Sequence, residues 1–360
     1  MNLIEFGDCR EIMRKWKEEG IKAQTCVTSP PYYGLRDYGT AKWVGGDESC
    51  GHVESENKHG GQRADRNQEG YKKQYKDICK KCGSVRQDSQ LGLEETPEEY
   101  IKAMVDVFRC VWDVLEDDGT LWLNIGDSYC GTGSKGDWVD PKNPEGRNGQ
   151  SVSKTQKLTG YKSKDLIGIP WMLAFALRAD GWYLRQDIIW HKPNPMPESV
   201  QDRCTKSHEY IFLMSKSSKY YYDHEAIKEA SVDPEGSANR YKAPFFAGEK
   251  HESGGYSAIG ATHTKGMKEF DGQRNKRSVW TVNTKPYAGA HFAVFPQELI
   301  EPCILAGAPV GGLVLDPFMG SGTTAQVAKH LNRQYIGCEL NKEYKPLQDK
   351  RLRQFVLELI

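Results

Sequence analysis

The stretch TSPPYYGLRDYG, residues 28–39, places a hydroxyl side chain, two prolines and two aromatic rings side by side. Proline fixes φ and has no N–H donor, so the carbonyl of Pro30 can be aimed in one direction as a hydrogen-bond acceptor. Ser29 offers a second oxygen next to it, and Tyr32 offers a flat ring. Such a segment can hold a planar amine by its N–H hydrogens. Alternatively, it is a rigid strand-to-loop connection with an aromatic plug.

A second candidate site follows near the C-terminus, in VLDPFMGSGTTAQVAKHL. Gly320 and Gly322 let the backbone approach a ligand closely, and the helix that follows points free N–H groups there. Asp316 can accept from an ammonium or a hydroxyl. The loop lacks the lysine of a phosphate loop and the spacing of a dinucleotide fingerprint. Glu339 ends a later strand, where an acid holds ribose hydroxyls in doubly wound sheets. A tight turn is the alternative reading.

A polar segment contains four residues of metal-ligand type, Cys50, His52, Cys79 and Cys82. The C-x-x-C-G half is typical of a zinc-knuckle turn, and the four groups would complete a tetrahedral site of three sulfurs and one nitrogen. The C-x-H spacing of the first half is unusual, and His59 is a substitute ligand. The sequence thus predicts a structural zinc that holds this polar segment in shape. The alternative is an exposed loop with incidental thiols.

Strand-like and helix-like segments alternate along most of the chain, which predicts a mainly parallel sheet with helices on both faces. A helix from Thr96 onward is marked by its capping threonine, by Pro97 and by Glu99. Strands are expected at 2–7, 24–29, 119–127, 183–194, 208–217, 334–340 and before Asp316, with helices between them, at 297–305 and at the C-terminus. Polar interruptions at 41–90, 131–164 and 229–278 read as excursions from the edge of the sheet.

Composition narrows the class of protein. The chain has 360 residues, 49 basic and 49 acidic side chains, and ten cysteines. No apolar run is long enough to cross a membrane, and the N-terminus lacks a secretion-type apolar core. We therefore expect a cytoplasmic protein, of a bacterium or a phage-infected cell, with reduced thiols. The balanced charge gives no bulk attraction for a polyanion, so nucleic-acid binding would need a locally basic face.

DPFMGSGTT together with TSPPYY resembles the DNA amino-methyltransferases, which use S-adenosylmethionine to methylate cytosine N4 or adenine N6. GDCREIM, DGTLWLNIGDSY, IIWHKPNPMPES and HEYIFLMSKS match this family in order. The catalytic motif precedes the cofactor loop, as in the permuted beta group, and GLRDYG resembles a subgroup common in phages and prophages. The resemblance implies a Rossmann-like class I methyltransferase fold, circularly permuted, with a seven-stranded mixed sheet, one antiparallel edge strand and helices on both faces.

The resemblance also implies roles for single residues. Ser29, Pro30, Pro31 and Tyr32 would form the catalytic motif: it accepts both N–H hydrogens of a flipped-out base, frees the amine lone pair and stacks the base on Tyr32. The cofactor would contact a loop of Asp316, Phe318, Gly320, Ser321, Gly322 and Thr323, with Glu339 on its ribose, Asp8 beside its adenine, and Phe292, Phe295 and Pro296 at its methionine end. His191, Lys192, Tyr33, Trp190 and Trp280 are possible pocket residues, although core packing is as good a reading for the two tryptophans.

The resemblance implies double-stranded DNA as substrate and a restriction endonuclease as a possible partner. The catalytic domain would comprise residues 1–40, 91–228 and 279–360, with the zinc insertion at 41–90 and target recognition at 229–278. Basic residues in the excursions, such as Lys164, Arg274 and Arg277, would face phosphates. Serine before Pro-Pro favours cytosine N4, and adenine N6 stays the alternative. RNA or protein-amide methylation, and a non-catalytic DNA-binding module, are further alternatives. Ring-carbon methylation is disfavoured because Cys26 and Cys303 read as buried thiols.

Overall fold

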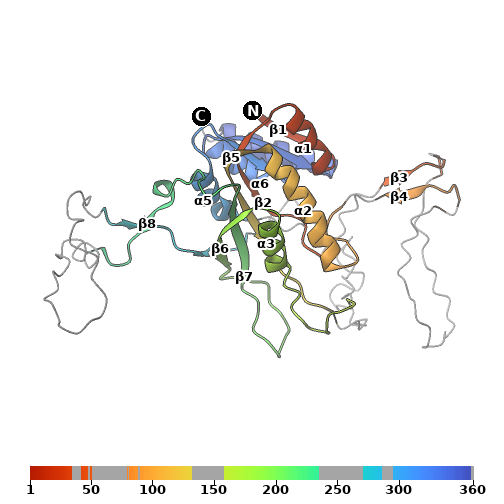
Figure 1. The fold of residues 1–360 in the computed structure, drawn as a ribbon, viewed down its shortest axis with the longest axis horizontal. Coiled ribbons are helices and arrows are strands. Elements are labelled where there is room, and N and C mark those ends of the chain that lie inside the picture. The colour runs from red at the N-terminus through yellow and green to blue at the C-terminus, as the bar shows by residue number, and fades with distance from the viewer. Residues whose placement is uncertain are drawn as a thin grey trace.

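The computed structural model describes residues 1–34, 42–47, 49–50, 79, 81–87, 90–131, 158–234, 271–285 and 295–357. These residues build an α/β structure around an eight-stranded sheet of order β1-β12-β11-β2-β5-β7-β6-β10 (Figure 1). The strands of this sheet are β1 Asn2–Phe6, β2 Ala23–Thr28, β5 Leu115–Ile125, β6 Tyr183–His191, β7 His208–Ser215, β10 Val279–Thr281, β11 Leu313–Asp316 and β12 Gln334–Glu339.

The expected sheet is confirmed in outline and wrong in two details. Neighbours from β1 through β12, β11 and β2 to β5 are parallel. The predicted count of seven strands misses β10, a three-residue strand that pairs with the outer edge of β6. The antiparallel strand is also not at the edge, because β7 lies between β5 and β6. The chain crosses from β5 over a helix to β6 and then turns back, so that β7 fills the position between them.

Helices cover both faces of the sheet, as predicted. On one face α1 Cys9–Glu18, α2 Pro97–Val114 and α3 Ile169–Ala179 bury Trp16, Phe108 and Leu173 against the strands. On the other face α5 Gln297–Gly307 and α6 Thr323–His330 bury Ile304 and Ala325. The remaining helical elements are η1 Glu225–Ile227, η2 Lys342–Tyr344 and α7 Lys345–Leu357.

The start of α2 shows how local sequence fixes these elements. The Thr96 side chain accepts from the backbone N–H of Glu99, and the Glu99 carboxylate accepts from the backbone N–H of Thr96. Pro97 occupies the first turn, where its missing N–H costs nothing. The predicted capping box is therefore confirmed.

Two small antiparallel ribbons, which the sequence did not predict, lie outside the main sheet. One pairs β3 Lys42–Val44 with β4 Val85–Gln87, and the other pairs β8 Glu229–Ala230 with β9 Gln273–Arg274. Figure 1 shows the β3–β4 ribbon standing away from the core on one side and β8 on the opposite side. The ribbons lie within residues 41–90 and 229–278, whereas all eight strands of the main sheet lie outside those segments. Among the described residues, no helix is long and apolar enough to cross a membrane.

Candidate active site

The two motifs singled out in the sequence meet at one edge of the sheet. Strands β2 and β11 are parallel neighbours, with Leu315 opposite Cys26, so their carboxyl ends lie side by side. The Thr28 hydroxyl donates to the Asp316 carboxylate at 2.6 Å, across 288 positions of sequence. Ser29 follows the first of these residues directly, and the glycine loop follows the second. The structure thus brings together the segments that we expected to share a site.

Asp316 is buried and holds the glycine loop in place. Besides Thr28, its carboxylate accepts from the Thr324 hydroxyl at 2.6 Å and from the Phe318 backbone N–H at 3.0 Å. Burial raises the pKa of Asp316 to about 6, although these three donors favour the ionised form. Both carboxylate oxygens therefore have protein donors, which means that Asp316 positions the loop whether or not it touches a ligand.

The loop between β11 and α6 is shaped for close approach of a ligand. Gly320 and Gly322 adopt φ values of +52° and +87°, in the left-handed region that favours glycine. A Cβ on Gly320 would enter open space, with only the Phe318 carbonyl oxygen nearby at 3.8 Å. Ser321 Oγ is buried and has no hydrogen-bond partner in the described part of the chain. An unsatisfied buried hydroxyl beside an open backbone is the arrangement expected where a polar ligand binds.

Thr323, expected at the cofactor, has a protein partner in this structure. Its hydroxyl is buried and accepts from the Arg351 guanidinium of α7. Gln348, on the same helix, donates to the Gly320 carbonyl at 2.7 Å. These contacts could not be predicted from the sequence, because α7 carries no motif that marks it as a support for the loop. Thr323 and its partners therefore hold the start of α6 against α7.

Glu339 and Asp8 flank the loop from the two next strands. The Glu339 carboxylate accepts from the backbone N–H groups of Gly320 and Asn341, both at 2.7 Å, and burial raises its pKa to about 7. Because β1 pairs with β12, the Gly7 N–H donates to the Glu339 carbonyl at 2.9 Å. Asp8 follows Gly7 and caps α1. Burial raises the pKa of Asp8, but hydrogen bonds from Arg10 outweigh it and leave that pKa below its usual value.

The carbonyl groups of the Ser-Pro-Pro-Tyr segment differ in whether they are occupied. The Pro31 carbonyl accepts from the Tyr100 hydroxyl at 2.9 Å, and the Tyr33 carbonyl accepts from the Ser128 hydroxyl at 3.1 Å. Among the described residues, none donates to the Pro30 carbonyl. The carbonyls of Pro31 and Tyr33 are thus occupied, and the Pro30 carbonyl, which we expected to be an acceptor for substrate, is available.

The Tyr32 hydroxyl lies in a polar cluster that the sequence did not reveal. It donates to Glu209 Oε2 at 2.9 Å and accepts from the Ser29 hydroxyl at 3.4 Å. Lys192 pairs with the other oxygen of Glu209, and the Asn124 amide lies 3.5 Å from Oε2. Burial and the Glu209 charge hold the pKa of Tyr32 well above its usual range. The motifs LNIGD and HEYI contain these polar residues within otherwise apolar strands, which is the only local signal of their role.

Other aromatic and thiol groups belong to the core. Trp190 and Trp280 are buried on the α5 and α6 side of the sheet, and Tyr33 is buried against Tyr100. Cys26 and Cys303 are buried, and burial raises the pKa of both thiols, so the reading of both as structural is confirmed. Phe295, just before α5, is half-buried against the same core. Phe292 lies outside the described residues.

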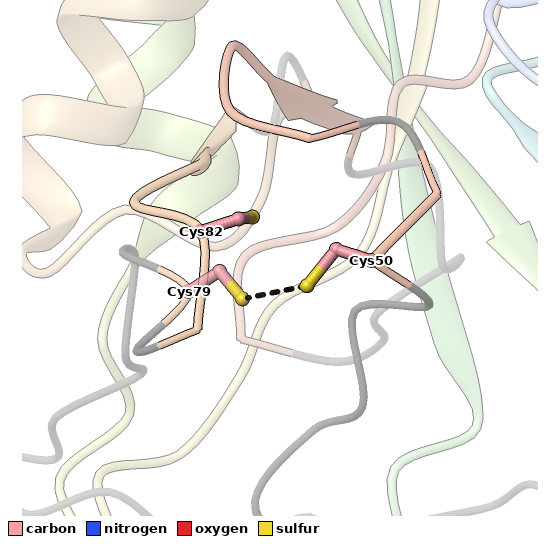
Figure 2. Close-up of side chains that lie close together, drawn as sticks. All are labelled: Cys50, Cys79 and Cys82. Carbon is pink, nitrogen blue, oxygen red and sulfur yellow. Dashed lines mark hydrogen bonds between the residues drawn. The ribbon is translucent and has the colours of Figure 1, made fainter.

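Three of the four predicted metal ligands cluster at the β3–β4 ribbon. The sulfur atoms of Cys50, Cys79 and Cys82 all lie within 4.8 Å of one another, and Figure 2 shows the three side chains converging. The Cys50 and Cys79 sulfurs are 3.8 Å apart. Gly83 takes a left-handed φ of +74°, and its N–H donates to the Cys79 carbonyl at 2.8 Å, as in a knuckle turn. His52 lies outside the described residues.

Comparison with known proteins agrees with this geometry. A family model described as DNA methylase matches residues 23–350. The type II methyltransferase M.SmaI of Serratia marcescens is 42% identical over 350 residues, which cover 97% of this chain and 90% of that protein. The type II methyltransferase M.Cfr9I of Citrobacter freundii is 40% identical over 348 residues, covering 96% and 86%. The solved PvuII DNA methyltransferase (cytosine-N4-specific) has a TM-score of 0.54 at 15% identity, covering 97% and 86%.

A mixed sheet with helices on both faces and a glycine loop between two strand-end acids defines the class I, S-adenosylmethionine-dependent methyltransferases. Within that class, the chain belongs to the N6/N4 family of DNA methylases, and the predicted kinship with DNA amino-methyltransferases is confirmed.

The raised pKa of Glu339 predicts a pH-dependent affinity for S-adenosylmethionine. An ionised carboxylate accepts from ribose hydroxyls and attracts the sulfonium, so affinity should rise as pH passes through about 7, where Glu339 loses its proton. Below that value, affinity should fall by at most about tenfold per pH unit. Calorimetric titration from pH 5.5 to 8, in buffers of different ionisation enthalpy, would also count the proton released.

In Glu339→Gln, binding should be weak and should lose the change in affinity near pH 7, so that any dependence left below about pH 6 belongs to Asp316, whose pKa is about 6. Glu343→Gln, which removes an exposed carboxylate on the same segment, should keep the wild-type profile. An unchanged pH dependence in Glu339→Gln would contradict the assignment of this titration to Glu339.

Proposed function

We propose that this enzyme transfers a methyl group from S-adenosylmethionine to the exocyclic amine of a flipped-out base in duplex DNA, with cytosine N4 the favoured target. The observation that carries the proposal is the Thr28–Asp316 hydrogen bond. It holds the free Pro30 carbonyl and the open glycine loop at the same edge of the sheet. An acceptor for an amine and a cradle for a methyl donor are thereby neighbours, although they come from opposite ends of the chain.

The residues at the loop fit S-adenosylmethionine. Glu339 would accept from the ribose hydroxyls of the cofactor. The Ser321 hydroxyl, which has no partner among the described residues, would form a hydrogen bond with the cofactor, and Gly320 leaves room for close backbone contact. Asp8 would line the adenine side and Phe295 the methionine end. Once bound, the cofactor supplies an electrophilic methyl group on a sulfonium.

The catalytic motif would prepare the amine. The lone pair of an exocyclic amine is delocalised into its ring, which makes the nitrogen a poor nucleophile. Ser29 and Pro30 would accept its two N–H hydrogens, favouring a tetrahedral nitrogen with the lone pair free to attack. Tyr32 would offer its ring to the extruded base. Because the acceptors are fixed before the base arrives, orientation and electrostatics supply the acceleration.

Serine ahead of Pro-Pro supports cytosine N4, since a hydroxyl is the acceptor and an acid or amide stands there in the adenine-type motif of the resembling family. Adenine N6 is the alternative outcome. The kinship with type II methyltransferases supports duplex DNA as substrate and a restriction endonuclease as partner. Assignment to a phage-type subgroup and the permuted connectivity stay predictions.

Basic side chains lie in the loop between β6 and β7, which leaves this edge of the sheet. Arg203 and Lys206 would face the phosphates beside the target base, although Arg203 also pairs with Glu198 at 2.6 Å. Lys192, in the same loop, pairs with Glu209.

Arg274 and Arg277, in the proposed recognition segment, both pair with Glu229 at 3.0 and 2.9 Å. Those two arginines thus shape the β8–β9 ribbon as much as they offer charge to DNA.

The decisive experiment is incubation with labelled S-adenosylmethionine and unmodified plasmid DNA, followed by nucleoside analysis. We expect label in N4-methylcytosine. Label in N6-methyladenine would retain the amino-methyltransferase and correct the base. Label in 5-methylcytosine, or label only in added RNA or protein, would contradict the proposal.

Removing the serine acceptor should separate turnover from cofactor binding. We expect Ser29→Ala to lower kcat by roughly tenfold to a hundredfold, the range for one hydrogen bond made in the transition state. The Kd for S-adenosylmethionine should stay within about twofold, because Ser29 does not line the loop. Ser218→Ala, an exposed serine beyond the opposite end of β7, should match the wild type. Equal losses in kcat and cofactor affinity for Ser29→Ala would oppose its assigned role.

We also propose a structural zinc in the 41–90 insertion. Two thiolates bound at about 2.3 Å to one tetrahedral ion lie roughly 3.8 Å apart. The Cys50–Cys79 separation of 3.8 Å supports such a site, and it is far too long for a disulfide. Cys82 would be the third ligand and His52 the fourth. The ion would fix the β3–β4 ribbon, and it has no part in methyl transfer.

Protein purified without chelator should contain about one zinc per chain by mass spectrometry of the metal. Cys82→Ser should lose most of it, because two thiolates and one imidazole hold zinc less tightly. Cys204→Ser, which changes an exposed cysteine outside the cluster, should retain it. Metal-free wild-type protein from zinc-supplemented cells would refute the site.

A further inference from the structure

The catalytic tyrosine is held at both its ring and its hydroxyl. The ring lies against Gly126, where a Cβ would come within 2.6 Å of Tyr32 Cε2. At the far end, the hydroxyl donates to Glu209 Oε2 at 2.9 Å. The ring therefore cannot move toward β5. Glu209 is the nearer acceptor for the phenolic proton, and Asn124 Oδ1 lies farther from the hydroxyl, at 3.3 Å.

Glu209 is itself fixed by its surroundings. It lies on β7 opposite Trp190 of β6, and its second oxygen pairs with the Lys192 ammonium. The two charged side chains are only 17% and 16% exposed. The Lys192 ammonium also lies 4.2 Å over the Trp190 ring. This pairing neutralises the carboxylate and leaves it little freedom to rotate.

The directions of the hydrogen bonds that link Glu209, Tyr32 and Ser29 decide whether Ser29 can donate to a ligand or only accept from it. An ionised carboxylate can only accept, and Glu209 Oε2 is charged and lies closer to the Tyr32 oxygen than Asn124 Oδ1 does, at 2.9 Å against 3.3 Å. The Tyr32 hydroxyl therefore donates its single proton to Glu209. The Tyr32 oxygen can then only accept, and the Ser29 hydroxyl, 3.4 Å away, donates to it. Ser29 has no second proton, so its lone pairs alone face outward. A base amine, which donates N–H hydrogens, fits that polarity, whereas a base carbonyl does not.

We propose that Glu209 is a positioning residue for methyl transfer, which acts through the Tyr32 hydroxyl to make Ser29 an obligate acceptor for the target amine. The inference rests on the proposed function, because it assigns the direction of a hydrogen-bond chain at that same site. Glu209 touches neither base nor cofactor in this role. Its influence passes from the carboxylate to the phenol, and from the phenol to the serine.

A double-mutant cycle tests this order. Glu209→Gln keeps the size of the side chain but lets its amide donate to Tyr32, which allows the chain to reverse. Tyr32→Phe keeps the ring and breaks the chain. Each variant should lower kcat by roughly tenfold or more. The kcat of the double variant should lie within about twofold of the kcat of the less active single variant, because both changes remove the same hydrogen bond.

Three further readouts separate positioning from other roles. The Kd for S-adenosylmethionine and the melting temperature should stay close to wild type, and the remaining activity should keep the wild-type pH profile. Glu5→Gln is the matched control: Glu5 is also a strand carboxylate that accepts from one aromatic N–H, of Trp16 at 2.7 Å, and from one lysine, Lys15 at 3.2 Å. It lies on β1, and its kcat should be unchanged.

Multiplicative losses in the double variant would overturn the proposal, because Glu209 would then act independently of Tyr32. A shifted pH profile in Glu209→Gln would also overturn it, since that result makes Glu209 a proton acceptor. Wild-type kcat in Glu209→Gln would do the same. Failure of the proposed function is seen separately, as an absence of methylated amine in DNA treated with the wild-type enzyme.

Discussion

The active site depends on the buried hydrogen bond between Thr28 and Asp316. Each residue is the last of its strand, so the two side chains meet only when β2 and β11 pair in the observed register. A hydrogen bond to a buried charge contributes ~1.5–3 kcal/mol, and its loss would leave only Thr324 and the Phe318 N–H to compensate the carboxylate for the water it gave up. The same contact therefore stabilises the sheet and sets the distance between the Pro30 carbonyl and the glycine loop. A slip of one residue in this register would turn Thr28 to the opposite face and separate the two loops.

The strand-end acids bring an electrostatic cost to this edge. Burial raises the pKa of Asp316 to about 6 and that of Glu339 to about 7, so the ionised form of each carboxylate is destabilised in the protein alone. Hydrogen bonds from hydroxyl and backbone donors offset part of this destabilisation. A ligand that brings hydroxyl donors and a positive centre relieves the remainder, which gives a physical reason for the edge to prefer a cationic nucleoside over a neutral one.

Most of the architecture follows from local sequence, because strands and helices alternate with clear boundaries. The capping box at Thr96 and the glycine loop could both be predicted from a few neighbouring residues. Glu209 could not, since no local pattern shows that one polar residue of a strand meets a tyrosine 177 positions away. The contact between Thr323 and Arg351 of α7 could not be predicted either, because the motif around Thr323 gives no information about a helix 22 positions farther along the chain. Short-range preferences of the backbone are therefore readable from the sequence, whereas long-range side-chain partners are not.

The insertion that follows the catalytic motif leaves the site undisturbed for a geometric reason. The Gly34 N–H donates to the Gly92 carbonyl at 2.8 Å, so the chain departs and returns at a single closed point. Gly92 also has no space for a side chain, because a Cβ there would lie 2.9 Å from the Tyr32 carbonyl oxygen. Since the closure cost of a loop grows only slowly with its length, segments of very different size can leave from this point. The hydrogen bond from Tyr100 to Pro31 then keeps the motif fixed independently of whatever the insertion contacts. The segment that carries the predicted zinc ligands can therefore vary in length while the Pro30 carbonyl stays in place.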